Sequence, residues 1–127
     1  MTYATSNPYE TLFGYSRAVR KGAYIFVSGT TWIDPETGYV QHPDSAYRQA
    51  LVIFKEIINS IEHLQGSRED VARVRMFVTE QGDTEAVGRA LKESLGDVRP
   101  AATMIVGARF VDGDMKVEIE ADAIVLA

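Results

Sequence analysis

Charged side chains alternate with apolar residues in two segments of the sequence, residues 71–79 and 117–123. Side chains two positions apart point to the same side of a β-strand, so each segment predicts a strand with one apolar and one ionic face. Carboxylates on such a face can move protons, and arginines can bind anions. These groups could also pair with one another between the sheets of several copies of the chain, or remain the solvated face of a monomer. The predicted ionic face carries Arg17, Arg73, Arg75, Glu118, Glu120 and Asp122.

Other catalytic arrangements lack the residue spacing that they need. His42 and His63 have no acidic or histidine partner at the spacing of metal ligands, which favours surface positions and predicts no metal site. Asp112 and Asp114 flank a glycine and are typical turn residues, not a catalytic carboxylate pair. Ser28 lacks the flanking glycine of a nucleophile elbow, so acyl transfer is not expected.

The composition is that of one globular domain. The 127 residues suit a single domain over residues 1–127, and no apolar run approaches the roughly 18 residues that a membrane helix needs. The first residues lack the basic start and apolar core of a secretory signal, and the chain has no cysteine, which together predict a cytoplasmic protein. The net charge of −5 disfavours binding to nucleic acid, because it repels a phosphate backbone.

The first half of the sequence predicts a β-hairpin followed by a long helix. Aromatic and β-branched residues in 16–30 surround a turn at Gly22, and residues 34–38 form a Pro- and Gly-containing surface turn. Asp44-Ser45 offers a helix N-cap, after which apolar residues recur every three or four positions. We expect Gly66 to end this helix in the left-handed conformation and the broad apolar stripe to cover a sheet.

The second half predicts a strand, a shorter helix and two final strands. The helix begins at Asp83 or Thr84 and ends at Gly96. The last two strands, at about 101–111 and 116–126, are predicted to form a hairpin because Asp112-Gly-Asp joins them. The order ββαβαββ predicts an α+β fold, in which two helices cover one face of a mixed sheet and leave the other face open.

Motifs along most of the chain resemble the RidA/YjgF family. Arg99-Pro-Ala-Ala-Thr-Met-Ile-Val-Gly-Ala-Arg-Phe, followed by Val117-Glu-Ile-Glu-Ala-Asp-Ala, is similar to the end of that family's sequence. Each remaining motif is weak alone, but their shared order and spacing strengthen the resemblance. They are Gly14-Tyr15, Ile25-Phe-Val-Ser-Gly29, Asp34-Pro-Glu-Thr-Gly-Tyr-Val40, Gln49-Ala-Leu and Glu69-Asp-Val-Ala-Arg-Val-Arg-Met-Phe-Val78.

The resemblance implies a chorismate-mutase-like fold and a homotrimer, whose sheets form a central β-barrel with three clefts between subunits. It also implies the binding of a small-molecule ligand and the hydrolysis of reactive 2-enamines and 2-imines to a 2-keto acid and ammonia. No metal or organic cofactor is implied, because water adds to a C=N carbon that is already electrophilic. The protein then has to hold the substrate, orient water and manage protons.

The resemblance also assigns residues to the implied cleft. Tyr15 matches an aromatic residue at its edge, Gly29 a position where backbone approaches the ligand, and Glu120 the acid that positions the attacking water. Other positions depart from the family's pattern. Ala102 replaces a carboxylate-binding arginine, Gly88 an asparagine and Met104 a cysteine or similar residue, with Thr103 between the last two in the implied contact set.

Ala102 makes the deamination of ordinary 2-imino acids doubtful. A guanidinium that binds a carboxylate makes two charge-assisted hydrogen bonds of about 1.5–3 kcal/mol each, so its loss lowers affinity on the order of 10²- to 10⁴-fold. Either the ligand has no carboxylate there, or another cation replaces the arginine, for which Arg17 and Arg75 are the candidates. Alternatively both arginines pair with carboxylates of the ionic face, Glu120 is such a partner, and Tyr15 only packs.

Three functions are therefore considered. The first is hydrolysis of imines, enamines or related small nitrogen compounds, and the second is binding of a small metabolite without catalysis. The third is RNA cleavage, an activity attributed to some relatives. The acidic net charge and the lack of a His-His or His-Lys arrangement argue against the third.

Overall fold

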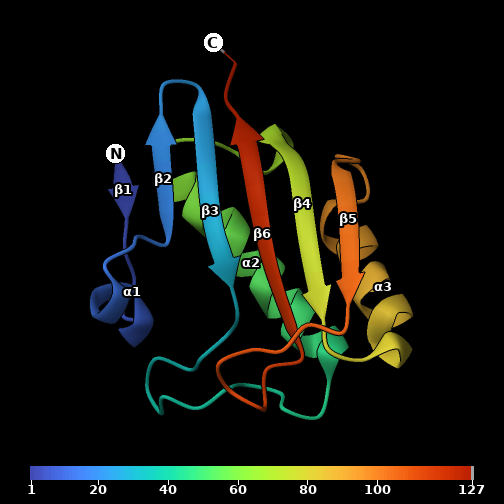
Figure 1. The fold of residues 1–127 in the computed structure, drawn as a ribbon. Helices are drawn as coiled ribbons and strands as arrows, with labels where there is room; N and C mark the ends of the chain where they lie inside the picture. Colours follow the sequence, from blue (N-terminus) through green and yellow to red (C-terminus); the bar gives the residue numbers. More distant parts are fainter. Residues whose placement is uncertain (127) are drawn as a thin grey trace.

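The computed structural model describes residues 1–126 and shows a six-stranded mixed sheet with its two longer helices on one face (Figure 1). The α+β fold and the predicted ββαβαββ order are confirmed, with one short strand and one short helix added before them. The strands are β1 (Thr2–Tyr3), β2 (Ala18–Lys21), β3 (Tyr24–Thr30), β4 (Val71–Val78), β5 (Ala101–Val106) and β6 (Val117–Ile124). The helices are α1 (Pro8–Phe13), α2 (Ala46–His63) and α3 (Thr84–Leu95), with 3₁₀ turns at Arg68–Asp70 and Gln81–Asp83.

The strand order is β1-β2-β3-β6-β4-β5, so the predicted hairpin between the last two strands is wrong. Strand β5 pairs in parallel with β4, to which α3 connects it, and β6 inserts between β3 and β4. A parallel pair needs such a helical crossover, and the crossover places β5 at the outer edge. The turn signal itself is real, because the Met115 N–H donates to the Asp112 carbonyl at 3.1 Å. That turn lies in a longer connection, residues 107–116, which carries the chain past the end of β4.

The core lies between the sheet and helices α2 and α3. The apolar positions predicted for β4 and β6 are buried, as are those of α2. Ser45 caps α2 as predicted, and its side chain accepts a hydrogen bond from the Arg48 N–H at 3.1 Å. The left-handed residue after α2 is Gln65, with φ 66°, and not Gly66. Gly66 is needed for space instead, because a Cβ there would lie 2.8 Å from the Ile25 Cδ1 atom.

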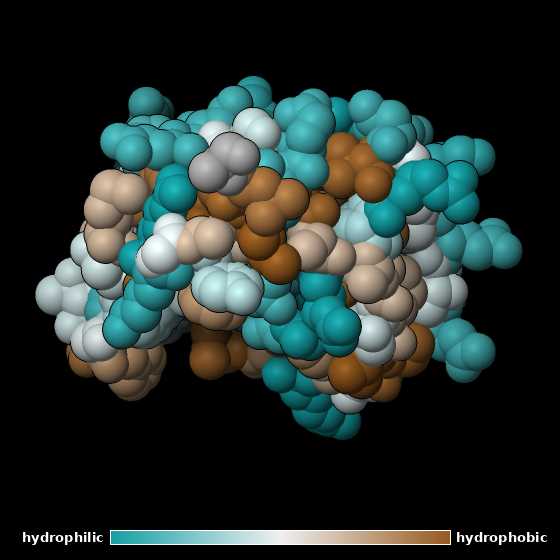
Figure 2. All heavy atoms as spheres, turned by 90° about the horizontal axis from the view of Figure 1, so that it is seen from above, coloured by the Kyte–Doolittle hydropathy of each residue, from teal (hydrophilic) through white to brown (hydrophobic). Residues whose placement is uncertain are grey.

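The other face of the sheet carries no helix. Seen from above, one long side of the molecule is concave and exposes apolar side chains between polar margins (Figure 2). Tyr24 and Phe26 on β3 are 54% and 48% exposed, and Ile105 and Ile124 also remain accessible. We call this side the open face. Within residues 1–126, no helix is both long enough and apolar enough to cross a membrane.

Candidate functional site

A hollow of about 210 Å³ lies where the end of β3, the start of β6, helix α1 and the 107–116 connection meet. The pairing of β3 with β6 shifts by one residue between Val27 and Thr30, and bulges of this kind are common beside functional sites. We call this site the Glu118 hollow. It is lined by Asn7, Tyr9, Phe13, Tyr15, Arg17, Gly29, Thr31, Arg109, Phe110, Val111, Met115 and Glu118.

Glu118 and Gly29 lie in close contact within this hollow. A Cβ atom on Gly29 would be 3.1 Å from both Cδ and Oε2 of Glu118, so the glycine leaves room for the carboxylate. Partial burial raises the pKa of Glu118, an effect that Arg17 opposes and Glu120 reinforces. A partly buried carboxyl group with a raised pKa beside an open hollow is suited to exchanging protons with a bound molecule.

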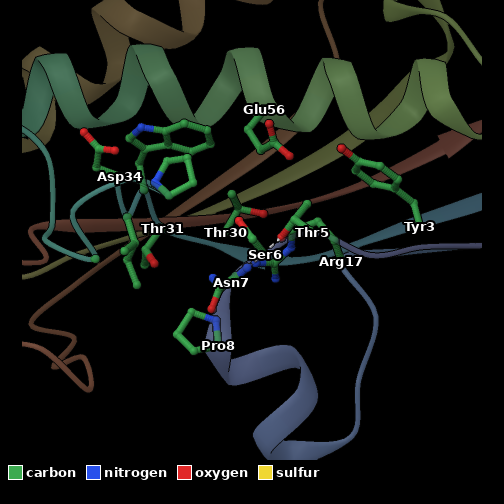
Figure 3. Close-up of a pocket in the computed structure, with 14 residues that line it drawn as sticks. Tyr3, Thr5, Ser6, Asn7, Pro8, Arg17, Thr30, Thr31, Asp34 and Glu56 are labelled. Atoms are coloured by element: carbon green, nitrogen blue, oxygen red, sulfur yellow. Dashed lines mark hydrogen bonds between the residues drawn. The ribbon is translucent and has the colours of Figure 1, made fainter.

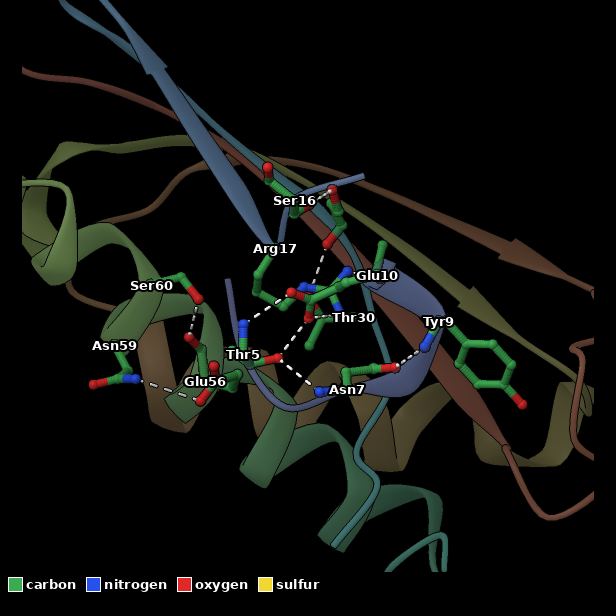
Figure 4. A network of polar contacts seen from close by, with 12 residues as sticks. Thr5, Asn7, Tyr9, Glu10, Ser16, Arg17, Thr30, Glu56, Asn59 and Ser60 are labelled. Carbon is green, nitrogen blue, oxygen red and sulfur yellow. Dashed lines mark hydrogen bonds and ion pairs between the residues drawn. The ribbon is translucent and has the colours of Figure 1, made fainter. Parts of the chain in front are cut away.

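Arg17 lines the hollow, but its charge serves the fold. The side chain is only 2% exposed, and Nη2 donates to the Gly29 carbonyl at 2.7 Å. Nη1 lies 3.9 Å from Oε2 of Glu10. In that carboxylate Oε1 accepts a hydrogen bond from the backbone N–H of Thr5, and Oε2 accepts one from the Thr5 hydroxyl (Figure 4). The guanidinium carbon also lies 5.7 Å from the centre of the Tyr15 ring. Arg17 thus fixes α1 and the end of β3 around the hollow.

Arg75 and Glu120 lie outside the hollow, in the middle of the open face. Nη1 of Arg75 donates to Glu120 at 3.2 Å and to Asp122 at 3.3 Å. Arg75 on β4 stands directly opposite Glu120 on β6, which is the favourable register for oppositely charged side chains. The charges of both residues are therefore compensated within one chain.

Gly88, Ala102, Thr103 and Met104 lie on α3 and β5, at the opposite edge of the sheet from β1. Ala102 and Thr103 are exposed, and their register partners on β4 are Val74 and Arg75. None of the four lines the Glu118 hollow. One chain therefore brings together Tyr15, Arg17 and Gly29, but not the four positions on α3 and β5.

Glu118 and Arg109 also line the hollow, although the sequence does not mark either as a site residue. The alternation places Glu118 on the ionic face but does not separate it from Glu120. Arg109 belongs to a family motif, and it precedes β6 in the connection that returns to the hollow. Arg109 is exposed and makes no ion pair or side-chain hydrogen bond within residues 1–126.

The histidines lie away from the Glu118 hollow. His63 stacks on Tyr3 with ring centroids 4.4 Å apart, and His42 takes a positive φ of 53° in the loop before α2. Over residues 1–126, no three His, Cys, Asp or Glu side chains gather in a way that could hold a metal ion.

Comparison with known proteins gives consistent matches over nearly the whole chain. A family model described as endoribonuclease L-PSP matches residues 5–125. An uncharacterized protein from Streptomyces coelicolor is 34% identical over 119 residues, which cover 94% of this chain and 87% of that protein. A crystal structure of a YjgF/YER057c/UK114 family member from Mycobacterium tuberculosis has a TM-score of 0.87 and 29% identity over 98% of each chain. The crystal structure of Escherichia coli TdcF with bound serine has a TM-score of 0.77 and 25% identity over 87% of each chain.

Proposed function

The chain belongs to the RidA/YjgF family, and we propose that it binds small nitrogen-containing metabolites in the Glu118 hollow and hydrolyses their C=N bond. The observation that carries this proposal is the partly buried Glu118 carboxyl group beside Gly29, which has a raised pKa and no ion-pair partner within 4 Å among residues 1–126. In this role Glu118 takes the place that the sequence resemblance gave to Glu120.

The reaction needs little more than a positioned acid–base group. Glu118 accepts a proton from a water molecule while the oxygen of that water bonds to the imine carbon. The same carboxyl group returns this proton to nitrogen, which gives a carbinolamine. Glu118 then takes the hydroxyl proton and passes it to the amine nitrogen, so that the C=O bond forms, the C–N bond breaks, and a carbonyl compound and ammonia leave. Tyr15 borders the hollow, and Tyr9 and Phe13 supply apolar walls for the body of the substrate.

Arg109 is the cation that we assign to a substrate carboxylate. Arg17 and Arg75 are already paired with Glu10 and with Glu120 and Asp122, whereas Arg109 faces the same hollow as Glu118 with its charge uncompensated in the described chain. The serine found in TdcF, an amino acid with one carboxylate, supports a ligand of this class. A single guanidinium on an exposed side chain would hold it more weakly than a preorganised bidentate clamp.

The complete cleft, in this proposal, forms between subunits of a homotrimer. The exposed aromatic residues on β3 and the distance along the sheet between the hollow and β5 support this assembly. When a second copy packs on the open face, the hollow of one subunit would be completed by four residues of the other subunit, namely Gly88, Ala102, Thr103 and Met104. A solution mass of about 42 kDa, three times the 14.0 kDa of one chain, tests it. The expected cytoplasmic location belongs to the same proposal and rests on the cysteine-free sequence.

The second candidate is a protein that binds such metabolites without turnover. It is favoured by the three departures at Gly88, Ala102 and Met104 from the family's pattern. RNA cleavage, the activity named by the family model, is less well supported, because the hollow presents two arginines, of which Arg17 is held by Glu10 and the Gly29 carbonyl, one glutamate and no histidine.

Ammonia release distinguishes the candidates. The full chain is incubated with 2-imino acids produced in place by an amino acid oxidase, and separately with a carboxylate-free imine whose nitrogen carries no carbon substituent, so that its hydrolysis also releases ammonia. A rate above buffer supports the hydrolase, and we expect Arg109→Ala to raise KM for the carboxylate-bearing imines by about tenfold. Arg48→Ala, on the exposed side of α2, is the matched control. Saturable serine binding that Arg109→Ala weakens, without any turnover, would favour the binding protein. If the chain showed no turnover and no binding, both functions would be excluded.

A further inference from the structure

A second cavity, of about 250 Å³, lies between the N-terminal segment, the loop after β3 and helix α2 (Figure 3). We call it the Glu56 cavity. It shares Asn7, Arg17 and Thr31 with the Glu118 hollow, but Glu118 and Arg109 do not line it. Its wall includes the apolar residues Trp32, Ile33 and Pro35 and three charged residues, Arg17, Asp34 and Glu56.

Two of the three charged groups in this wall are committed to the fold. Arg17 is held by Glu10 and the Gly29 carbonyl. Asp34 stabilises the turn that follows it, because its Oδ1 accepts from the Glu36 N–H at 2.8 Å and its Oδ2 from the side chain of Gln41 at 3.2 Å. Both oxygens of Asp34 are therefore used, and Arg17 keeps only a buried Nε without a hydrogen-bond partner within residues 1–126.

Glu56 is the remaining charge. Within residues 1–126 its only side-chain hydrogen bond is a long one of 3.5 Å from the Asn59 amide, and it makes no ion pair. Partial burial raises the pKa of its carboxyl group. In Figure 3 the side chain projects from α2 towards Thr5 of the N-terminal segment and Thr30 at the end of β3. Arg17 and His63 oppose this effect of burial on the pKa, but neither forms an ion pair with Glu56 within residues 1–126. A carboxylate that is partly removed from water and makes no ion pair favours a cation in the cavity.

The rest of the cavity wall favours an organic cation over a metal ion. Trp32, Ile33 and Pro35 supply apolar surface, and an indole face also attracts a positive charge. The volume lies just below the usual range for drug-sized ligands, which suits a molecule of few non-hydrogen atoms. We propose that the Glu56 cavity binds a small organic amine in its protonated form, with the ammonium group on Glu56 and the hydrocarbon part against Trp32 and Ile33.

The protein carries its own probe for this site, since Trp32 is the only tryptophan in the chain. The fluorescence of the full chain is titrated with n-butylammonium chloride at constant ionic strength, and in parallel with n-butanol and sodium butyrate. We expect a saturable change with the amine alone. Glu56→Gln should weaken amine binding by at least about tenfold, because it removes a charge-assisted hydrogen bond. Glu62→Gln, an exposed position on the same helix, should leave binding unchanged.

Several results would overturn the proposal. These are no saturable change up to about 50 mM amine, equal affinity in Glu56→Gln, or tighter binding of butyrate than of butylammonium. If Glu56→Gln does not fold by circular dichroism, Glu56→Asp takes its place, since it keeps the charge but withdraws it by one methylene group, and weaker binding is again expected. Glu118→Gln should retain amine binding, so this site and the proposed reaction can fail independently.

Discussion

Two carboxylates on strand β6 lie two residues apart on the same face of the sheet, yet their surroundings differ. Glu120 stands opposite Arg75 and receives a hydrogen bond from it at 3.2 Å. Glu118 stands opposite Phe77 and lies over Gly29, and burial raises its pKa. One carboxylate is compensated by a cross-strand partner, whereas the other is kept partly buried without an ion pair in residues 1–126. The neighbouring strands, and not the alternation along β6, therefore decide which carboxyl group is available for proton transfer.

Neutralising Glu118 and Glu120 one at a time should give the largest difference in activity between two variants. Glu118→Gln should lower kcat for imine hydrolysis by about 10²- to 10⁴-fold, the range for loss of a general acid–base group. Glu120→Gln should change kcat by less than about threefold, because its charge faces Arg75 and not the hollow. Rates of ammonia release measure both. A larger loss in Glu120→Gln, in a protein of unchanged mass, would return the catalytic role to Glu120.

The next largest effect is expected when a cation for the substrate carboxylate is introduced at position 102. Ala102→Arg restores the guanidinium that the family resemblance leads one to expect, on a strand that one chain does not bring to its own hollow. We expect kcat/KM for carboxylate-bearing imines to rise by about 10²-fold, the lower end of the range for a bidentate pair. A carboxylate-free imine is the control and should show no gain. An equal gain for both substrates, or none in a correctly assembled protein, would contradict a site shared between subunits.

Much of the fold could be predicted because its signals are local. The periodicity of α2 and the alternation in β4 and β6 identify both the elements and their buried faces, and Ser45 caps α2 through its own side chain. The strand order could not be predicted in the same way. A turn at Asp112 is compatible with a hairpin and with a longer connection, and only the crossover through α3 places β4 between the last two strands.

The residues of the candidate site could also be predicted only in part. Tyr15 and Gly29 were named from sequence and do line one hollow, although their roles stay predictions. Glu118 could not be separated from Glu120, because the difference comes from a bulge on β3 and an arginine on β4. Arg17 was a candidate cation, but no pattern in sequence pairs it with Glu10, on a helix that was not predicted.

A substitution of Arg75 tests the ion pairs that this arginine makes with Glu120 and Asp122. Arg75→Ala leaves Glu120 and Asp122 without their shared partner on the open face. Because these groups are about one third exposed, we expect a loss of about 1 kcal/mol or less in the free energy of unfolding of one chain. In a trimer that buries the open face, the same change should also weaken assembly, which a solution mass measured over a dilution series would detect. Lost ligand binding with an intact trimer would instead make Arg75 a ligand contact.

The smallest effect concerns stability as a function of pH. The pKa of Glu118 is raised in the folded chain, so the folded state binds this proton more tightly than the unfolded state does. Above both pKa values the folded chain keeps a charge that burial disfavours. As the pH falls through the folded pKa towards the ordinary value of 4.5, Glu118 is protonated first in the folded state, and its contribution to stability rises.

Glu118→Gln removes this dependence. At neutral pH the variant should therefore be slightly more stable than the natural chain, by less than about 1 kcal/mol, and the difference should shrink towards pH 4. Urea unfolding of both proteins across this range measures it, and the raised pKa of Glu56 cancels because both proteins share it. Glu120→Gln should show the opposite sign at neutral pH, because it removes a partner of Arg75. If both variants were less stable than the natural chain at pH 7, Glu118 would be a paired structural carboxylate like Glu120, and the contrast between the two would be lost.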